Sequence, residues 1–127
     1  MAAILIVDDD PIFCTPFTAY LKKLGHQCQT AQTFSHGAAL ARYVYFDVVF
    51  LDVLLPDANG LECINYFINS PSSPELIIIT GKSEISGAEM ALENGAWDYL
   101  EKPPAYDDVK LTLKRALQFR DNKMVSP

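Results

Sequence analysis

The fold is decided by the stretch DVVFLDVLLPDANG, residues 47–60. Its apolar run Val48–Leu51 includes two β-branched valines and predicts a strand buried on both faces, which is typical of parallel sheets. The strand ends at Asp52. Ligands of open parallel sheets bind just beyond the carboxyl ends of the strands, so this carboxylate is a candidate for chemistry. Residues 56–60 contain Pro, Asp, Asn and Gly and predict a turn.

Three further apolar runs also end at polar residues. They are Ala2–Val7 before Asp8-Asp9-Asp10, Leu76–Ile79 before Thr80, and Ala96–Leu100 before Glu101 and Lys102. Because the carboxyl ends of parallel strands meet at one edge of a sheet, we expect the acids, the hydroxyl and the amine at these ends to lie together. The sequence therefore predicts one site around Asp52, in which carboxylates and a lysine converge.

The polarity of the strands predicts their order in the sheet. Gln27–Ala31 is the most polar strand candidate, and Ala96–Leu100, which contains Asp98, is the next. Polar strands belong at sheet edges, so the runs Ala2–Val7, Val48–Leu51 and Leu76–Ile79 lie inside. Crossovers of the usual right hand then give the order 2-1-3-4-5. The expected fold class is α/β, a doubly wound (βα)5 arrangement around a parallel sheet.

Helices are expected between and after these strands. Their predicted extents are Pro11 to Gly25, a cap at Thr33 or Ser35 to about Val44, Gly60–Ile68, Glu84–Asn94, and Asp107 to about Phe119. Pro16 removes a hydrogen bond from the first helix, so we expect a kink or a late start there. Glu84–Asn94 is the weakest candidate, because it has few large apolar residues. Residues 1–120 are expected to form the domain, and residues 121–127 a polar tail or the start of a linker.

Length and charge limit the classes of function. A chain of 127 residues is one domain of ordinary size. The net charge of -6 and the lack of a long basic run argue against direct nucleic-acid binding by this chain. Three widely spaced cysteines without a neighbouring histidine indicate neither a disulfide framework nor a zinc site. The apolar opening lacks the features of a signal peptide or membrane span, which predicts a cytoplasmic protein.

The ordered set of residues at the strand ends resembles the receiver domains of bacterial two-component response regulators. The resemblance rests on Asp8 and Asp9, Asp52 with Pro56 and Gly60 at the family's spacing, Thr80, and Lys102-Pro103. It covers nearly the whole chain. It implies a flavodoxin-like fold and phosphoacceptor signalling, with a sensor histidine kinase as phosphodonor. The run Gly95–Pro103 is similar to receivers attached to enhancer-binding transcription activators, so transcription is the expected output.

The resemblance also implies a role for each residue of the site. Asp52 would be the phosphoacceptor, and Lys102 and Thr80 would contact the phosphoryl group. Mg²⁺ would be bound by Asp9, Asp52 and the backbone carbonyl of Leu54, with Asp8 acting mostly through water. Hard oxygen ligands of this kind suit Mg²⁺, which usually bridges to phosphate through one or two carboxylates. The peptide bond before Pro103 is cis in this family.

A switch is implied in the same way. Thr80 would move toward the phosphoryl group and Tyr99 would turn inward, which changes the surface formed by the fourth helix, the fifth strand and the fifth helix. We expect Trp97 on the same side of the strand as Tyr99 and Leu111 pointing away from the core. Such a surface could contact an output domain or a second copy after phosphorylation.

Two other functions compete with that of a phosphoacceptor. A phosphatase of the haloacid dehalogenase type needs an acid two residues after the nucleophile, but this position is Leu54. A binding module with a degenerate site is disfavoured, because every residue of the site is present. Asp10 and Asp57 are interpreted as turn residues.

Overall fold

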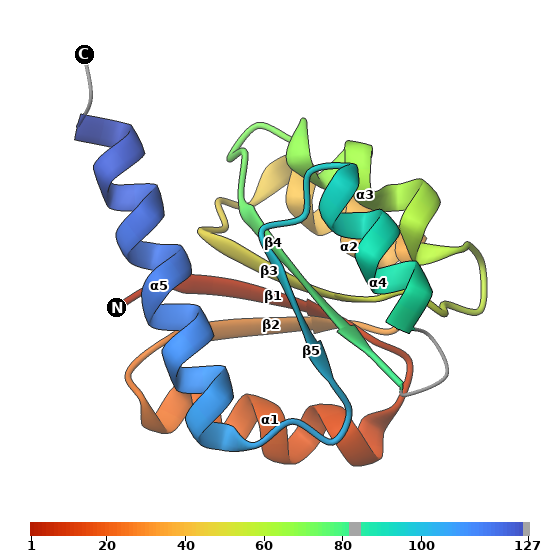
Figure 1. Cartoon of the computed structure of the whole chain (residues 1–127), viewed down its shortest axis with the longest axis horizontal. Helices are drawn as coiled ribbons and strands as arrows, with labels where there is room; N and C mark the ends of the chain where they lie inside the picture. Colours follow the sequence, from red (N-terminus) through yellow and green to blue (C-terminus); the bar gives the residue numbers. More distant parts are fainter. Residues whose placement is uncertain (82–84, 126–127) are drawn as a thin grey trace.

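The computed structural model describes residues 1–81 and 85–125, with the side chains of all of these except 60–62, 85–88 and 125. At its centre is a five-stranded parallel sheet with the order β2-β1-β3-β4-β5. The strands are β1 (Ala3–Val7), β2 (Gln27–Ala31), β3 (Val48–Asp52), β4 (Glu75–Thr80) and β5 (Asp98–Glu101). The predicted order is confirmed, and the two polar strands lie at the edges (Figure 1).

Helices cover both faces of the sheet. They are α1 (Pro11–Lys23), α2 (Phe34–Tyr43), α3 (Gly60–Ile68), α4 (Ile85–Glu93) and α5 (Tyr106–Val125). Figure 1 shows α1 and α5 on one face and α2, α3 and α4 on the other. This is the doubly wound α/β fold that the sequence predicts. The expected start of the fourth helix, Glu84, lies outside the described residues.

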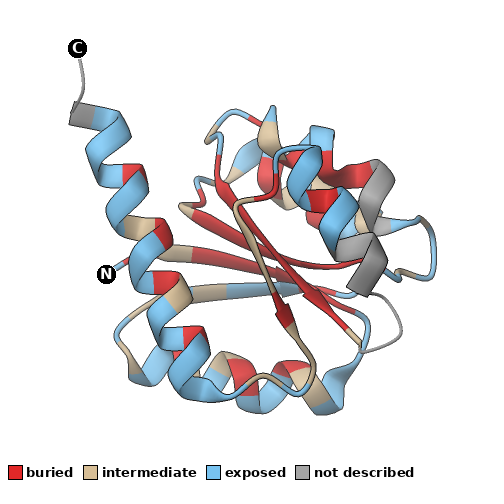
Figure 2. Cartoon of the chain, in the orientation of Figure 1, coloured by how far each residue is buried: buried red, intermediate tan, exposed pale blue. Residues whose placement is uncertain are grey.

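Burial explains why the apolar runs became the inner strands. Every residue of β3 and β4 is buried, whereas only Ala31 is buried in β2. Figure 2 shows the same contrast between the inner and outer strands. A strand covered by helices on both faces needs apolar side chains at every position, and an edge strand does not.

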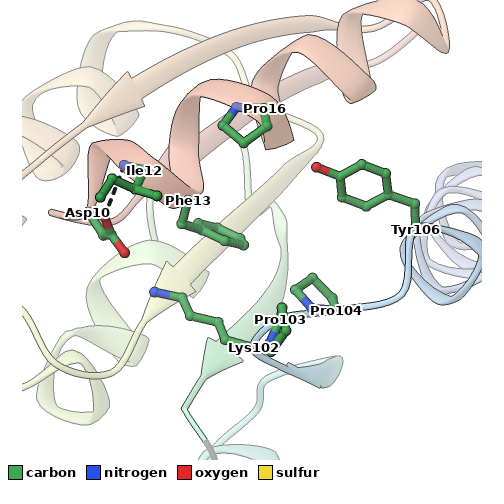
Figure 3. A pocket seen from close by; sticks show the side chains of 8 residues that line it. All are labelled: Asp10, Ile12, Phe13, Pro16, Lys102, Pro103, Pro104 and Tyr106. Carbon is green, nitrogen blue, oxygen red and sulfur yellow. Dashed lines mark hydrogen bonds between the residues drawn. The ribbon is translucent and has the colours of Figure 1, made fainter.

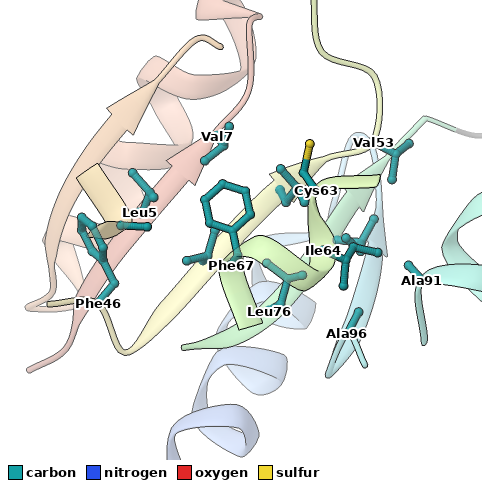
Figure 4. Close-up of a cluster of buried hydrophobic side chains, with 14 of the residues drawn as sticks. Leu5, Val7, Phe46, Val53, Cys63, Ile64, Phe67, Leu76, Ala91 and Ala96 are labelled. Atoms are coloured by element: carbon teal, nitrogen blue, oxygen red, sulfur yellow. The ribbon is translucent and has the colours of Figure 1, made fainter. Parts of the chain in front are cut away.

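The sheet separates two hydrophobic cores. The core beneath α2, α3 and α4 includes Leu5, Val49, Leu51, Ile64, Phe67 and Ile78 (Figure 4). The core beneath α1 and α5 includes Phe17, Leu21, Phe50, Val109 and Leu113. Consecutive residues of β3 belong to alternate cores, because successive side chains of a strand point to opposite faces.

The first helix starts without delay despite its internal proline. Asp10 caps α1, since its Oδ1 accepts a hydrogen bond from the Ile12 amide at 2.9 Å, and Pro11 is the first helical residue. Proline suits this position because its missing donor would have no partner there. Pro16 lies inside the continuous helix, so a late start is not observed. In the second helix, Thr33 and not Ser35 is the cap.

The last helix is longer than its sequence pattern predicts. We expected an end near Phe119 followed by a polar tail, but α5 continues to Val125. Val109, Leu113 and Ala116 are buried, and Leu111 is exposed as expected. The reason for the extension is Arg120, which lies one turn after Ala116 and is also buried.

Arg120 is held by a dense polar network. Its guanidinium donates five hydrogen bonds, to the side chains of Asp47, Glu75 and Tyr45 and to the carbonyls of Ser72 and Ser73. Lys123 adds two contacts of 3.0 Å to the carboxylate of Glu75. A buried charge is tolerated only when it is paired and hydrogen-bonded, and this arrangement meets both conditions.

The predicted placement of Trp97 is wrong. Trp97 packs against the core beneath α1 and α5, with its ring 6.2 Å from that of Phe119, whereas Tyr99 packs against the core on the opposite face. We expected both on one side because residues two apart in a strand share a face. That rule does not apply, because β5 begins at Asp98 and Trp97 lies before the strand.

The cysteines are free thiols, as expected. Cys14 and Cys63 are buried and Cys28 is half-buried. Burial, followed by the charge of Asp8, raises the pKa of Cys14 to about 12, so this thiol stays protonated at neutral pH.

Within the described part of the chain, no helix is long and apolar enough to cross a bilayer.

Candidate functional site

The candidate residues lie at the carboxyl edge of the sheet, as the strand pattern predicts. Asp8 follows β1, Asp52 ends β3, Thr80 ends β4 and Lys102 follows β5. In the sheet register, Thr80 pairs with Glu101, the residue before Lys102. Because the strands are parallel, their ends deliver these groups to one place.

Three carboxylates converge at the ends of β1 and β3. One oxygen from each of Asp8, Asp9 and Asp52 lies within 4.8 Å of the other two. Asp8 and Asp52 are buried, whereas Asp9 is exposed. Like charges at this spacing repel one another unless a cation lies among them. The cluster therefore has the electrostatic character of a cation site.

Lys102 bridges two of these acids. Its Nζ lies 2.6 Å from Oδ2 of Asp8 and 3.3 Å from Oδ2 of Asp52. The convergence of the lysine with carboxylates around Asp52 was expected, but the shorter contact with Asp8 was not. Nζ also lies 4.7 Å from the ring centroid of Phe13. The ammonium thus lies among two carboxylates and an aromatic face.

The pKa values of Asp8 and Lys102 are shifted by burial and by their pairing. Burial raises the pKa of Asp8, and its interactions with Lys102 and with the Asp10 amide offset this only in part. For Lys102, burial alone would lower the pKa, but hydrogen bonding and charge interaction with Asp8 and Asp52 outweigh it, so the pKa is raised. The lysine is therefore a stable cation in this site.

The backbone joins the fourth and fifth strand ends. The amide of Lys102 donates a hydrogen bond of 2.7 Å to the carbonyl of Thr80. The peptide bond between Lys102 and Pro103 is cis, as the family resemblance implied. The hydrogen bond between the two backbones holds Lys102 next to Thr80.

Thr80 and Tyr99, the two residues of the expected switch, lie on neighbouring strands. Thr80 is fully buried, and its Oγ1 donates a hydrogen bond of 3.2 Å to the carbonyl of Gly81. This distance is long for a hydroxyl donor, so the bond is weak. Tyr99 is half-buried and lies opposite Ile78 in the register.

The loop after Asp52 is tied back to the strand and across to α2. The amide of Leu54 donates a 3.0 Å hydrogen bond to Oδ1 of Asp52, and Leu54 also forms an isolated bridge with Asn59. Asp57 accepts hydrogen bonds from the backbone amides of Phe34 and Ser35 at 2.8 and 3.0 Å. The loop that carries Leu54, the expected carbonyl ligand, is therefore hydrogen-bonded to Asp52 at its start and to the first turn of α2 through Asp57.

Three residues have roles that the sequence reasoning missed. Asp10 and Asp57 were interpreted as turn residues, yet each caps the start of a helix. An acid directly before a proline is a signal that could have identified Asp10 as a cap. Asp57 lies 23 residues from its partner Phe34, and no local pattern indicates that contact. Phe13 was expected only as part of the apolar stripe of the first helix, because an aromatic residue in such a stripe indicates core packing.

The donor set fits a magnesium ion. The residues that converge offer carboxylate oxygens, which are hard ligands, and the described residues near them contribute no thiolate or imidazole to the cluster. Asp9 is exposed, so one side of the cluster is open to the waters that Mg²⁺ usually keeps. The chemistry and the exposure of the acids are both compatible with a magnesium ion.

Comparison with known families gives one match over most of the chain. The family model described as response regulator receiver domain matches residues 4–114. Among curated proteins, the chain is 36% identical to Protein PilH of Pseudomonas aeruginosa over 119 residues, which is 92% of this chain and 98% of PilH. It is 34% identical to the transcriptional regulatory protein ZraR of Klebsiella oxytoca over 90% of this chain, but spans only 26% of that protein.

Solved structures have the same fold. A response regulator receiver domain protein (CheY-like) from Methanospirillum hungatei superposes with a TM-score of 0.90 at 26% identity, covering 97% of this chain and 98% of that one. NtrX from Brucella abortus gives a TM-score of 0.90 at 29% identity, covering 97% of this chain and 28% of NtrX. The fold therefore occurs both as an almost complete chain and as part of a longer one.

Proposed function

Because this chain belongs to the family of response regulator receiver domains, the signalling domains of two-component systems, we propose that Asp52 accepts a phosphoryl group. One observation carries the proposal. The carboxylate at the end of β3 lies 3.3 Å from the Lys102 ammonium and beside the carboxylates of Asp8 and Asp9. A nucleophile, a cation and a set of metal ligands in one place are what transfer to an aspartate requires.

In this reaction an oxygen of the Asp52 carboxylate forms a bond to phosphorus. The bond between phosphorus and the donor atom breaks, and its electron pair leaves with the donor. The donor is a phosphohistidine of a sensor histidine kinase or a small acyl phosphate. The chain turns over no separate substrate and takes part only in its own phosphorylation and dephosphorylation.

We propose that Asp9, Asp52 and the backbone carbonyl of Leu54 bind Mg²⁺ directly, while Asp8 acts mostly through water. The convergence of the acids supports this assignment, and so does the tie between the Leu54 amide and Asp52, which keeps that residue beside the cluster. When bound, the ion offsets the negative charge of the phosphoryl oxygens and of the acids.

Lys102 and Thr80 would bind the phosphoryl oxygens. Lys102 would exchange its contact with Asp52 for a charge-assisted hydrogen bond to one oxygen, which the flexible stem of a lysine allows. The Thr80 hydroxyl would donate to another oxygen in place of its weak bond to the Gly81 carbonyl. Neither change requires a strong contact to be broken without replacement.

The movement of Thr80 would start the switch. We propose that it draws the Tyr99 ring inward and changes the surface formed by α4, β5 and α5. Tyr99 is half-buried on the strand next to Thr80, and Met90 of α4 and Leu111 of α5 are 55% and 45% exposed. This surface therefore has apolar groups available for an output domain or a second copy.

The proposed partners are a sensor histidine kinase and an output that regulates transcription, in the cytoplasm. The relatives named ZraR and AlgB are transcriptional regulatory proteins, and the chain spans 26% of each. We propose no direct contact with nucleic acid by this domain, because the net charge of -6 opposes binding to phosphates.

Phosphoryl uptake tests the proposal directly. We expect wild-type protein treated with acetyl phosphate to gain the mass of one phosphoryl group only in the presence of Mg²⁺. Asp52→Asn should gain none, because an amide is not a nucleophile for this transfer. Intact-mass measurement of both proteins, with and without Mg²⁺, provides the answer. Equal labelling of the two proteins would assign the phosphoryl group to another residue.

A further inference from the structure

We propose that Phe13 is a positioning residue that keeps the Lys102 ammonium close to Asp52. This inference rests on the proposed function of the site. The Lys102 Nζ lies 4.7 Å from the Phe13 ring centroid (Figure 3). It also contacts Asp8 and Asp52. Cations are attracted to an aromatic face within about 6 Å of its centroid. The ring is therefore a third partner of the ammonium.

This third partner differs in kind from the other two. The two carboxylates are also the groups that metal and phosphoryl group would engage, so the lysine must weaken its contacts with them when the site is in use. The ring has no such competing role. Because the Lys102 side chain is only 20% exposed, the attraction is screened less than it would be at the surface. The ring thus stays available while Lys102 exchanges one oxygen partner for another.

The position of the ring is itself fixed from below. Phe13 stacks on Phe17 with centroids 4.9 Å apart, and Phe17 meets Phe50 edge-on at 5.1 Å. Phe17 and Phe50 are fully buried, and Phe50 lies in β3 two residues before Asp52. A series of aromatic contacts therefore connects the strand that bears the nucleophile to the ring that contacts the lysine.

The surroundings show what the ring prevents. A hollow of about 670 Å³ opens beside it, and its lining includes Lys102, Tyr106 and Phe13 itself. Figure 3 shows the Phe13 ring between helix α1 and the Lys102 side chain at this hollow. A smaller side chain at position 13 would let the ammonium and water move into that space. Phe13 therefore restricts the lysine to positions near Asp8 and Asp52.

The test compares Phe13→Leu with Phe13→Tyr. Leucine keeps an apolar contact with Phe17 but has no aromatic face, so phosphorylation by acetyl phosphate at saturating Mg²⁺ should slow roughly two- to tenfold. Tyrosine keeps the face and should restore the rate. Tyr20→Leu is the matched control, because it removes a ring of the same helix that stacks on Tyr106 at the same hollow. It should leave the rate unchanged.

A second measurement needs no activity, and its readout is taken on the wild-type protein. The ring current of Phe13 should move the NMR signals of the Lys102 ε-methylene protons upfield in the unphosphorylated wild type, with the signals assigned through Lys102→Arg. Ordinary shifts in the wild type, an unchanged rate in Phe13→Leu, no rescue by Phe13→Tyr, or equal slowing by Tyr20→Leu would each overturn the inference. Wild-type protein that shows the shift but takes up no phosphoryl group would contradict the proposed function and leave the contact intact.

Discussion

At the scale of single residues, the site contains more negative than positive charge. Asp8, Asp9 and Asp52 contribute carboxylates to the cluster, and Lys102 contacts two of them. Burial of Asp8 adds to the cost, since it raises the pKa of that carboxyl. The cluster is thus suited to a cation from solution, and we expect its acids to oppose folding when no such cation is bound.

Asp9→Asn tests this cost. Removing one charge of the cluster should leave the metal-free protein as stable as wild type or raise its Tm by roughly 2 to 4 °C, since repulsion is relieved. A ligand that binds only the folded state stabilises that state. The same variant, which lacks a metal ligand, should therefore lose the stabilisation that we expect Mg²⁺ to give to wild type. Thermal melts with Mg²⁺ and with EDTA measure both effects.

Asp121→Asn is the control for this comparison, since it removes an exposed acid of α5 outside the cluster. It should retain the full Mg²⁺ effect. If Asp9→Asn instead melts well below wild type in EDTA, Asp9 stabilises the metal-free fold, and the prediction that repulsion among the acids destabilises it is wrong.

At the scale of elements, α2 depends on a residue from a distant loop. Thr33 caps the helix by accepting from the His36 amide, and Asp57 accepts from the amides of Phe34 and Ser35. Together they satisfy donors that a helix start leaves without partners. The helix start and the loop that follows Asp52 are therefore held by the same carboxylate.

The hydrogen bonds to Asp57 predict a dependence of stability on pH. The amides of Phe34 and Ser35 lower the pKa of Asp57 below its ordinary value of 3.8, because they favour the ionised form. Its contribution to stability is therefore fully present above about pH 4 and is lost as the pH falls through the lowered pKa. We expect Asp57→Asn to be less stable than wild type at pH 7 and to lose less stability between pH 4 and pH 2.

Urea unfolding at a series of pH values measures this difference. Glu93→Gln serves as its control, because Glu93 is an exposed acid at the end of α4. The control should follow the wild-type pH profile. Parallel profiles for wild type and Asp57→Asn would show that the helix cap contributes nothing that depends on the charge of Asp57.

The elements were predictable where the cause is local. The apolar runs predict the inner strands, because burial on both faces leaves a strong pattern in the sequence. Asp8, Asp52 and Thr80 follow as the polar residues at the ends of these runs, and Lys102 follows as the cation after the edge strand β5. The side of Trp97 was predicted wrongly, since the pattern does not show where β5 begins. Whether a residue joins a strand depends on its packing against neighbouring strands and faces as well as on its own type.

At the scale of the whole molecule, Arg120 fastens the end of α5 to the opposite edge of the sheet from the site. Asp47 precedes β3 and Glu75 opens β4, so one guanidinium joins the starts of two inner strands to the last helix. No pattern in the sequence singles out Arg120. Its partners lie 45 and 73 residues away, and only the fold brings them together.

Loss of this side chain should be costly. Arg120→Met leaves the Asp47 carboxylate and the Ser72 and Ser73 carbonyls without their partner, and breaking a buried ion pair in this way costs about 3 to 5 kcal/mol. The free energy of unfolding in urea measures the loss. Lys123→Met is the control, because Lys123 contacts the same Glu75 but is half exposed, and its loss should cost less than about 1 kcal/mol. Similar losses for the two variants would mean that the burial of Arg120 is of no energetic importance.

The chain contains a single tryptophan, and its ring lies beside Phe119 rather than on the side of Tyr99. Its fluorescence is therefore an optical reporter of one layer of the molecule. When the indole is excited selectively, its emission reports how α5 packs against the sheet. It does not report directly on the ring of Tyr99, which packs on the other face. A spectral change on phosphorylation would consequently record movement of the last helix, while the tyrosine would need a label or a probe of its own.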